Sequence, residues 1–224
     1  HRDEHVLALD KPAGVVVHPV GAHQQGTLLQ ALHRRFRGPG GGGVNPKLVH
    51  RIDQFTSGVL LVAMSDDARR RFSRMLEAGE VAKEYDALLL GRMAADSASV
   101  DAPVGAVGDS RILMQVDPER GKPARSVFRA VERFPDATHA SVRILTGRTH
   151  QIRVHAAHLG HPLLGDHLYG DGLPIGDPPV LAHFALHARS VAFEHPYTRL
   201  PVRIEAPLPE LFLRAAAALR SGLH

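Results

Sequence analysis

The run from His50 to Gly58 (His-Arg-Ile-Asp-Gln-Phe-Thr-Ser-Gly) gathers a strong cation, a carboxylate, two hydroxyls and a glycine in one short segment. A carboxylate such as Asp53 beside a cation such as Arg51 stays ionised, because a nearby positive charge lowers its pKa. An ionised, oriented carboxylate acts as a nucleophile or as a general base. The alternative is a structural turn, in which Asp53 and Thr56 satisfy backbone groups and the glycine supplies an unusual dihedral. The nonapeptide alone leaves both interpretations open.

A second polar cluster runs from Gly147 to His155 (Gly-Arg-Thr-His-Gln-Ile-Arg-Val-His). If a helix begins at Thr149, then Thr149 and Arg153 share a face, because residues four apart on a helix are neighbours. Arg153 can then pair with a carboxylate from elsewhere, and Arg148 stands at the start of the helix. The alternative is a solvated basic face with Ile152 in the core. The concentration of His, Gln, Arg and Thr favours a functional role.

The third candidate is the short run Lys83-Glu84-Tyr85. Lys83 and Tyr85 point to the same side of a strand, because successive side chains alternate between its two faces. A tyrosine ring there can stack on a base or a sugar, with the lysine near a phosphate. Ordinary sheet alternation is the alternative for this run taken alone.

Metal binding needs consideration because the chain has 16 histidines. Zinc sites use histidines at helical spacing. However, the chain has no cysteine and no His-Glu-x-x-His motif, and Gly160 interrupts the helical pattern. We therefore expect no functional metal site. The histidines whose spacing raised the question are His155, His158, His161, His183 and His187.

Composition places the 224 residues among ordinary folded domains, with 44% hydrophobic and 22% charged residues. The net charge of +4 and the isoelectric point near 9.8 permit a polyanionic partner without demanding one. No apolar run approaches the ~20 residues that span a bilayer, so we expect no membrane association. The absence of cysteine suits a reducing cytoplasm.

The elements that must position these clusters are strands with occasional helices. Because strands and helices do not alternate regularly, the pattern predicts an α+β fold with a mixed, mostly antiparallel sheet. The residues Gly38 to Gly43 are expected to form a flexible connector. Helices are expected over 27–37 with a capping box, 66–78 capped by Ser65 and stopped by Gly79, 149–159 and 209–219. Strands are expected over 6–9, 15–17, 59–63, 81–90, 112–116, 126–134, 140–145, 180–185, 190–193 and 202–205.

Together and in this order, the motifs resemble the RluA-type family of RNA pseudouridine synthases. The resemblance extends from about Val6 to Pro207. It implies an isomerase that converts specific uridines in structured RNA (ribosomal or transfer RNA) to pseudouridine, without a cofactor or a metal. The segments that carry it are Lys11–Pro19, His50–Gly58, Lys83–Tyr85, Gly147–His155, Leu159–Asp166, Leu186–Ala188 and Phe193–Pro196.

The resemblance also implies roles for individual residues. Asp53 would be the catalytic aspartate, and Arg153 would pair with its carboxylate. Tyr85 would pack against the target base and assist proton removal, while Arg51 would hold the flipped nucleotide or fill its place. Phe55 departs from the acidic residue that is commoner there. Leu186 would line the pocket, and substrate contacts are expected from His50, Thr56, Lys83 and Arg148.

For the fold, the resemblance implies a single pseudouridine synthase catalytic domain over residues 1–224, with flanking helices and a central cleft. No S4-like RNA-binding module is expected in this chain, and a monomer is the simple expectation. The sequence does not choose whether the aspartate attacks C1′, removes a sugar proton or attacks the base.

Two other functions fit these residues less well. A non-catalytic RNA-binding protein is disfavoured by the intact Asp53, Tyr85 and Arg153. A hydrolase such as a glycosidase would need a second carboxylate as its acid, and none of the clusters supplies one.

Overall fold

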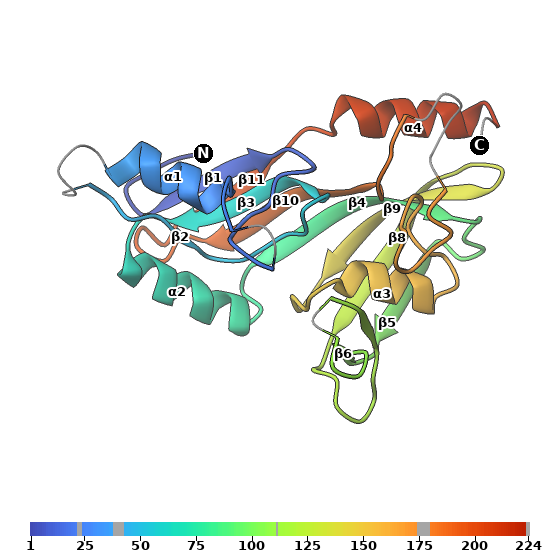
Figure 1. Cartoon of the computed structure of the whole chain (residues 1–224), viewed down its shortest axis with the longest axis horizontal. Helices are drawn as coiled ribbons and strands as arrows, with labels where there is room; N and C mark the ends of the chain where they lie inside the picture. The colour runs from blue at the N-terminus through green and yellow to red at the C-terminus, as the bar shows by residue number, and fades with distance from the viewer. Residues whose placement is uncertain (22–23, 38–42, 111, 174–179, 223–224) are drawn as a thin grey trace. The chain divides into compact units, whose positions relative to one another are not determined.

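The computed structural model describes residues 1–21, 24–37, 43–110, 112–173 and 180–222 (Figure 1). The chain forms two compact units. Unit 1 comprises His1–Val81 and Ala188–Pro207, and unit 2 comprises Ala82–His187 and Leu208–His224. The fold class is α+β, as the sequence predicts.

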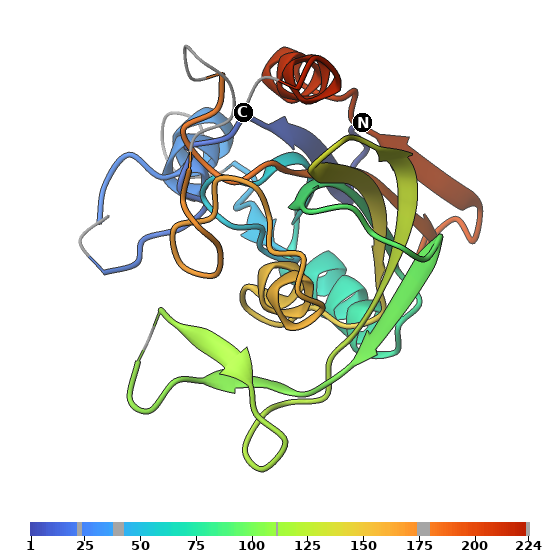
Figure 2. The ribbon, with the colours of Figure 1, turned by 90° about the vertical axis from the view of Figure 1, so that its right-hand side faces the viewer.

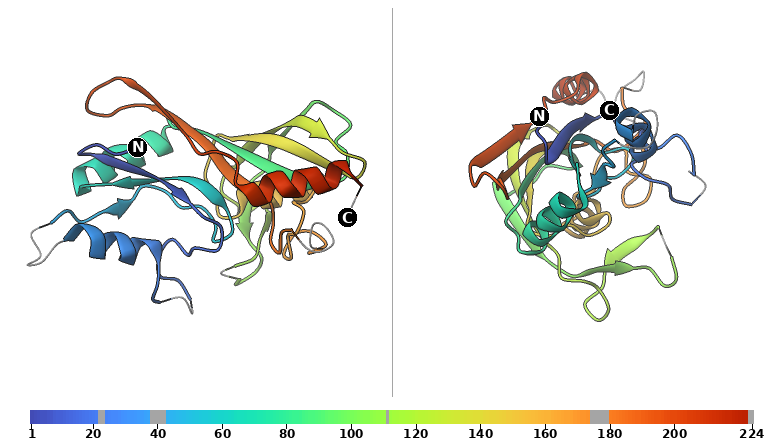
Figure 3. Two further views of the ribbon diagram at one scale, coloured as in Figure 1. Left: turned by 90° about the horizontal axis from the view of Figure 1, so that it is seen from above. Right: turned by 90° about the vertical axis from the view of Figure 1, so that its left-hand side faces the viewer.

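Unit 1 is a small sheet with a helix on each side. Strand β3 lies between β1 and β10, while β2 also pairs with β3 and β11 pairs with β10. The registers of β1 with β3, β2 with β3 and β10 with β11 are antiparallel. Figure 3 shows α1 and α2 on opposite sides of these strands. The elements are β1 (Val6–Lys11), α1 (Leu28–Arg37), β2 (Lys47–Leu48), β3 (Ser57–Ala63), α2 (Asp66–Glu77), β10 (Leu186–Glu194, with its first two residues in unit 2) and β11 (Pro201–Glu205).

The core of unit 1 forms where the sequence places its apolar run. Every residue of β3 is buried. Helix α2 begins as predicted, because the Ser65 hydroxyl accepts a hydrogen bond from the Ala68 N–H at 3.1 Å. The ring of Phe72 on α2 then packs edge-on against Phe193 of β10, with ring centroids 5.2 Å apart. This packing fixes β3, and with it the loop that precedes β3.

Helix α1 also begins near the predicted residue, but its capping box is only half formed. The Thr27 N–H donates to the Gln30 side-chain oxygen at 3.1 Å. The Thr27 hydroxyl, which the motif would use for the reciprocal bond, is buried and has no hydrogen-bond partner among the described residues. The sequence pattern therefore marks the helix start but not both of its bonds.

Unit 2 is built on four antiparallel strands in the order β4-β9-β8-β5. A separate two-stranded hairpin, β6 with β7, stands apart from them in Figure 2. Figure 1 shows α3 below and α4 above the main strands. The elements are β4 (Ala82–Leu90), β5 (Ser97–Asp101), β6 (Val104–Ala106), β7 (Met114–Val116), β8 (Arg125–Arg133), β9 (Ala137–Ile144), α3 (Gln151–His158) and α4 (Glu210–Arg220).

Several predicted elements are wrong. Residues 15–17 form no strand, because the carbonyls of Val16 and Val17 accept the N–H groups of Leu28 and Leu29 at the start of α1. Residues 180–185 form only an isolated bridge at Leu181. Strands β2, β5 and β6 were not predicted, since their short sequences carry little apolar alternation. Of the predicted connector at 38–43, residues 38–42 lie outside the described residues.

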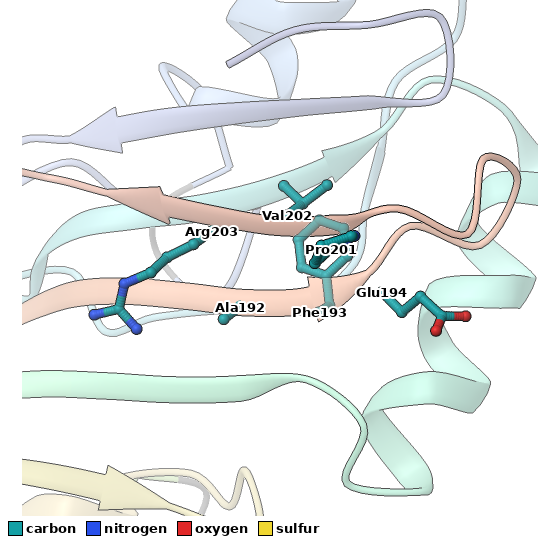
Figure 4. A pocket seen from close by; sticks show the side chains of 6 residues that line it. All are labelled: Ala192, Phe193, Glu194, Pro201, Val202 and Arg203. Atoms are coloured by element: carbon teal, nitrogen blue, oxygen red, sulfur yellow. The ribbon is translucent and has the colours of Figure 1, made fainter.

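Two further features are the hydropathy of the helices and a hollow on the surface of unit 1. Among the described helices, none combines the length and the hydropathy needed to cross a membrane. A shallow, open hollow lies on the β10–β11 hairpin of unit 1 (Figure 4). None of the predicted site residues lines it. Its lining residues are Ala192, Phe193, Glu194, Pro201, Val202 and Arg203.

Candidate active site

The loop that carries Asp53 connects β2 with β3 in unit 1. The Thr56 N–H donates to the Asp53 carbonyl at 3.1 Å, which closes a tight turn around the carboxylate. Thr56 itself is buried, with 1% of its surface exposed. Ile52, on the other side of Asp53, is buried at 8% exposure. The aspartate is therefore held half-buried between two anchored neighbours.

The two residues at the start of the loop have different partners. The Leu61 N–H of β3 donates to His50 Nε2 at 3.1 Å, so the histidine ties the loop to the buried strand. Arg51 is exposed, and its Nη1 lies 3.1 Å from Nε2 of His18. Burial, with the Arg51 charge as a second cause, lowers the pKa of His18. A neutral His18 can accept a hydrogen bond from the guanidinium, which fixes the direction of Arg51.

Below the loop lies Lys11, which is 1% exposed. Its Nζ donates to the carbonyls of Pro12 at 2.9 Å, Val15 at 3.1 Å and Gln54 at 2.8 Å. Burial lowers its pKa to about 8, and the Asp53 carboxylate opposes that lowering. Lys11 therefore joins the segment after β1 to the backbone beside Asp53 and supplies a positive charge near its carboxylate.

Gly58 shows why the motif ends in glycine. Its φ of +103° lies in a region that L side chains rarely adopt. A Cβ at this position would also stand only 2.2 Å from the Ala188 carbonyl oxygen of β10. Both constraints exclude a side chain, and the close approach places β10 directly beside the end of the loop.

In unit 2, Tyr85 and Lys83 occupy one face of β4, as the alternation predicts. Both are buried, at 7% exposure each. Tyr85 lies opposite Val142 of β9, and Lys83 lies opposite Ile144. The Lys83 ammonium donates to the Thr146 carbonyl across 3.4 Å. The lysine is thus buried beneath the turn that leads into α3.

Arg153 of α3 has a buried carboxylate partner that the sequence analysis did not identify. Its Nε and Nη2 donate to the two oxygens of Asp166, each at 2.7 Å. Asp166 is fully buried and Arg153 is 5% exposed. The guanidinium carbon lies 4.9 Å from the Tyr169 ring centroid and 4.2 Å from that of Phe184. Such a fork-to-fork pair between two rings fixes the guanidinium in one orientation. Its implied pairing with Asp53 stays a prediction.

The start of α3 differs from the prediction. The helix begins at Gln151, and the residue before it, His150, adopts a left-handed φ of 55°. Thr149 therefore lies before the helix, and the argument that it shares a helical face with Arg153 is wrong. His150 Nδ1 lies 2.8 Å from the Tyr169 hydroxyl, a contact that supports the unusual backbone.

The side-chain amide of Gln151 stabilises this turn through hydrogen bonds. Its side-chain oxygen accepts from the Thr146 hydroxyl at 2.7 Å and from the Arg148 N–H at 3.0 Å. Its side-chain nitrogen donates to the Arg125 carbonyl and the Ser126 hydroxyl, both at 3.0 Å. A buried amide with its oxygen and nitrogen both bonded holds the chain in one conformation.

The remaining predicted residues lie as follows. Arg148 is half-buried and its Nε donates to the Pro123 carbonyl at 2.9 Å. Leu186 is buried, at 6% exposure, at the start of β10. Unit 1 thus brings together His50, Arg51, Asp53 and Thr56 in one loop, and unit 2 gathers Lys83 and Arg148 at one turn.

Some residues of the site have no role in the sequence prediction, namely Lys11, His18, Gln151, Asp166 and Tyr169. The quoted motifs contain the first four, but their bonds to distant backbone and side chains leave no local periodic signal. Two of the histidines considered as metal ligands are bonded to other groups. His155 contacts the Ser126 hydroxyl and the Ala102 carbonyl, and His161 contacts the Leu90 carbonyl, each at 2.9 Å. No group of three metal-ligating residues occurs in the part of the chain described.

The motifs that contain Asp53, Tyr85 and Arg153 resemble those of a class of RNA-modifying isomerases. The family model for RNA pseudouridylate synthases matches residues 5–158. The chain belongs to this family and is an RNA uridine isomerase.

Two similar bacterial proteins are also named as pseudouridine synthases. The chain is 42% identical to the ribosomal large subunit pseudouridine synthase D of Pseudomonas aeruginosa, over 98% of this chain and 71% of that protein. It is 41% identical to an RNA pseudouridine synthase of Bacillus subtilis, over 94% of this chain and 68% of that protein.

Solved structures support the same fold. The human RNA pseudouridylate synthase domain-containing protein 4 has a TM-score of 0.81 at 22% identity, over 98% of this chain and 92% of that one. At this identity, the likeness concerns the fold alone. Human domain-containing protein 1 has a TM-score of 0.72 at 26% identity, over 99% of this chain and 93% of that one.

Proposed function

We propose that this enzyme converts uridine to pseudouridine in the RNA of the large ribosomal subunit, in the cytoplasm. The observation that carries the proposal is the 42% identity to a ribosomal large subunit pseudouridine synthase over 98% of the chain. Transfer RNA, the other substrate that the sequence leaves open, is an outcome of the experiment below.

Asp53 is the proposed catalytic residue. The reaction breaks the bond between N1 and C1′ and forms one between C5 and C1′, while C5 loses a proton and N1 gains one. No electron is gained or lost overall, so the residues need only supply a nucleophile or base and a route for the proton. The buried turn at Asp53 and the positive charge of Lys11 support an ionised carboxylate in a fixed position.

Arg153 is proposed to pair with Asp53 in the assembled site. Its Nε and Nη2 are occupied by Asp166, so Nη1 is the nitrogen proposed to face the catalytic carboxylate. Tyr85 is proposed to pack against the uracil and to assist removal of the C5 proton. Leu186 is proposed to line the same pocket.

Base flipping is the proposed route by which the uridine reaches these residues. Extruding a base costs a few kcal/mol, which contacts to phosphates and a stacking surface can offset. Arg51 is the proposed residue to hold the flipped nucleotide or fill its place, since it is exposed and directed by His18. His50, Thr56, Lys83 and Arg148 are proposed to support substrate binding.

The test is pseudouridine mapping on protein-free large-subunit ribosomal RNA and on transfer RNA, each made by transcription in vitro. The wild-type protein is expected to modify uridines in the ribosomal transcript. The Asp53→Asn variant is expected to lose the activity at least a thousandfold while keeping its unfolding midpoint and RNA affinity, because the amide preserves shape but cannot act as nucleophile or base.

Two results would contradict the proposal in different ways. Modification of transfer RNA alone would show that transfer RNA, and not ribosomal RNA, is the substrate. Full activity of Asp53→Asn would remove Asp53 from the catalytic role. An Asp109→Asn variant serves as the control, because Asp109 is an exposed carboxylate outside the site.

A further inference from the structure

Lys83 is buried without the partners that a buried ammonium normally has. An ammonium carries three donors, and burying one without bonds is costly. Within the described part of the chain, the hydrogen bonds of Lys83 amount to one, to the Thr146 carbonyl across 3.4 Å. Burial lowers the pKa of Lys83 to about 8, with the Arg148 charge as a second cause, and no carboxylate counteracts that lowering.

Gly147 lies beside the Lys83 ammonium and presents no side chain to it. This glycine is exposed, and a Cβ built on it would stand 3.3 Å from Lys83 Nζ. A side chain here would therefore lie directly over the ammonium. Because Gly147 has no side chain, no Cβ stands between the exposed turn and the ammonium.

A second cation, Arg148, lies next to Gly147 in the chain. Arg148 is close enough to repel the Lys83 charge, and its Nε is held by the Pro123 carbonyl at 2.9 Å. Neither Lys83 nor Arg148 takes part in an ion pair within the described residues. Two neighbouring cations with vacant donors and no carboxylate between them are the arrangement that binds an anion.

We propose that Lys83, Gly147 and Arg148 form a phosphate-binding subsite that receives a backbone phosphodiester of the RNA substrate. The assignment rests on the proposed function for the choice of RNA. Gly147 and Arg148 lie in the turn that leads into α3, four and three residues before its first residue, Gln151. A phosphate held there would complete the bonding of Lys83 and fix the RNA strand relative to Arg153.

The chemistry favours a phosphodiester over a carboxylate ligand. RNA offers phosphodiesters along its backbone and no carboxylates, and the two non-bridging oxygens of a phosphodiester can accept hydrogen bonds from Lys83 and Arg148. Each contact with a phosphate releases a counterion, so the logarithm of the RNA affinity falls with the logarithm of salt concentration, by about 0.7 to 0.9 per contact. A residue with only a structural role would leave this slope unchanged.

The experiment measures binding of protein-free large-subunit ribosomal RNA by filter retention from 50 to 200 mM salt. Lys83→Met removes the charge at nearly constant shape, and Gly147→Ala keeps the charge but covers it with a methyl group. Each variant is expected to reduce the salt slope by about 0.7 to 0.9, so its deficit shrinks about threefold over this range. Lys47→Met is the matched control, because the Lys47 Nζ already has Asp66 at 3.7 Å. It is expected to keep the wild-type slope.

The outcomes separate the proposals. A wild-type slope in both Lys83→Met and Gly147→Ala, with unfolding midpoints unchanged, would overturn the subsite. If inorganic phosphate at constant ionic strength lowers the RNA affinity of the wild type to that of Lys83→Met, phosphate displaces the RNA phosphodiester from this subsite, which supports the proposal. Failure of the wild type to form pseudouridine in any transcript would contradict the proposed function while leaving the slopes interpretable.

Discussion

Lys11 in unit 1 and Lys83 in unit 2 are both buried lysines whose pKa is lowered to about 8, yet their surroundings differ. Lys11 donates to three carbonyls between 2.8 and 3.1 Å. Lys83 donates to one carbonyl, across 3.4 Å. The charge that acts on the pKa of Lys11 is the Asp53 carboxylate, whereas the charge that acts on the pKa of Lys83 is the Arg148 cation.

This difference indicates separate roles for Lys11 and Lys83. All three donors of Lys11 are occupied, so it can hold the catalytic loop but has nothing left for a ligand. Lys83 makes one long hydrogen bond and lies beside Gly147, which has no side chain. This arrangement leaves donors for a ligand but contributes little to the stability of the fold. Burial alone therefore does not separate a structural cation from a binding one, but the number and length of its hydrogen bonds do.

Arg153 is a third buried cation, and it is paired with both oxygens of the Asp166 carboxylate. The largest loss of stability is expected when this pair is broken. Asp166→Asn replaces one acceptor oxygen with a nitrogen that faces the guanidinium donors. Breaking one partner of a buried pair costs about 3–5 kcal/mol, because a charge is left uncompensated. The free energy of unfolding in urea measures the loss.

Asp96→Asn is the matched control for that measurement. Its carboxylate pairs with Arg133 at the same 2.7 Å, but the Asp96 side chain is 95% exposed. A loss below about 1 kcal/mol is expected, because solvent screens exposed pairs. Equal losses in the two variants would show that burial of the Arg153 pair contributes nothing.

The next effect is expected from Lys11. Lys11→Met leaves the carbonyls of Pro12, Val15 and Gln54 without their common donor, and each unsatisfied buried acceptor costs about 1–3 kcal/mol. Part of this is offset because a desolvated charge is also removed. We expect a net loss of about 3 kcal/mol in the free energy of unfolding, measured in urea.

Lys83→Met is the comparison variant for Lys11→Met. It removes one long hydrogen bond together with a desolvated charge, so its free energy of unfolding is expected to change by less than about 1 kcal/mol. Similar losses in the two variants would remove the distinction between a structural and a binding lysine.

The sequence predicts the parts of this fold that depend on local pattern. The apolar run of β3, the Ser65 cap of α2 and the face shared by Lys83 and Tyr85 all follow from neighbours in the chain. The loop that carries Asp53 also lies directly before this buried strand, as the sequence predicts. The catalytic role of Asp53 stays a prediction.

What the sequence could not predict depends on contacts between distant residues. Asp166 lies 13 residues from Arg153, and Gln54 lies 43 residues from Lys11. No periodicity links such pairs. The left-handed His150 likewise moves the start of α3 past Thr149, because the Tyr169 hydroxyl, 19 residues away, supports it. Tertiary bonds thus decided the details that local propensity left open.

A comparably small effect is a pH dependence that isolates Lys83. With a pKa near 8 in the folded state and 10.5 when unperturbed, the unfolded chain binds more protons at this lysine between those values. The stability contributed by this position therefore rises as pH increases through 8. From pH 7 to pH 9, the free energy of unfolding of the wild type should rise relative to Lys83→Met by about 1 kcal/mol.

Lys11 is present in both proteins, so its titration cancels in this difference. RNA affinity should move in the opposite direction, since a neutral Lys83 no longer attracts a phosphate. Urea unfolding and filter retention at pH 7, 8 and 9 measure the two quantities. Stability and binding that change in the same sense would contradict a Lys83 that is destabilising when empty and favourable when bound to phosphate. Opposite changes would separate it from Lys11, whose charge is already satisfied by the fold.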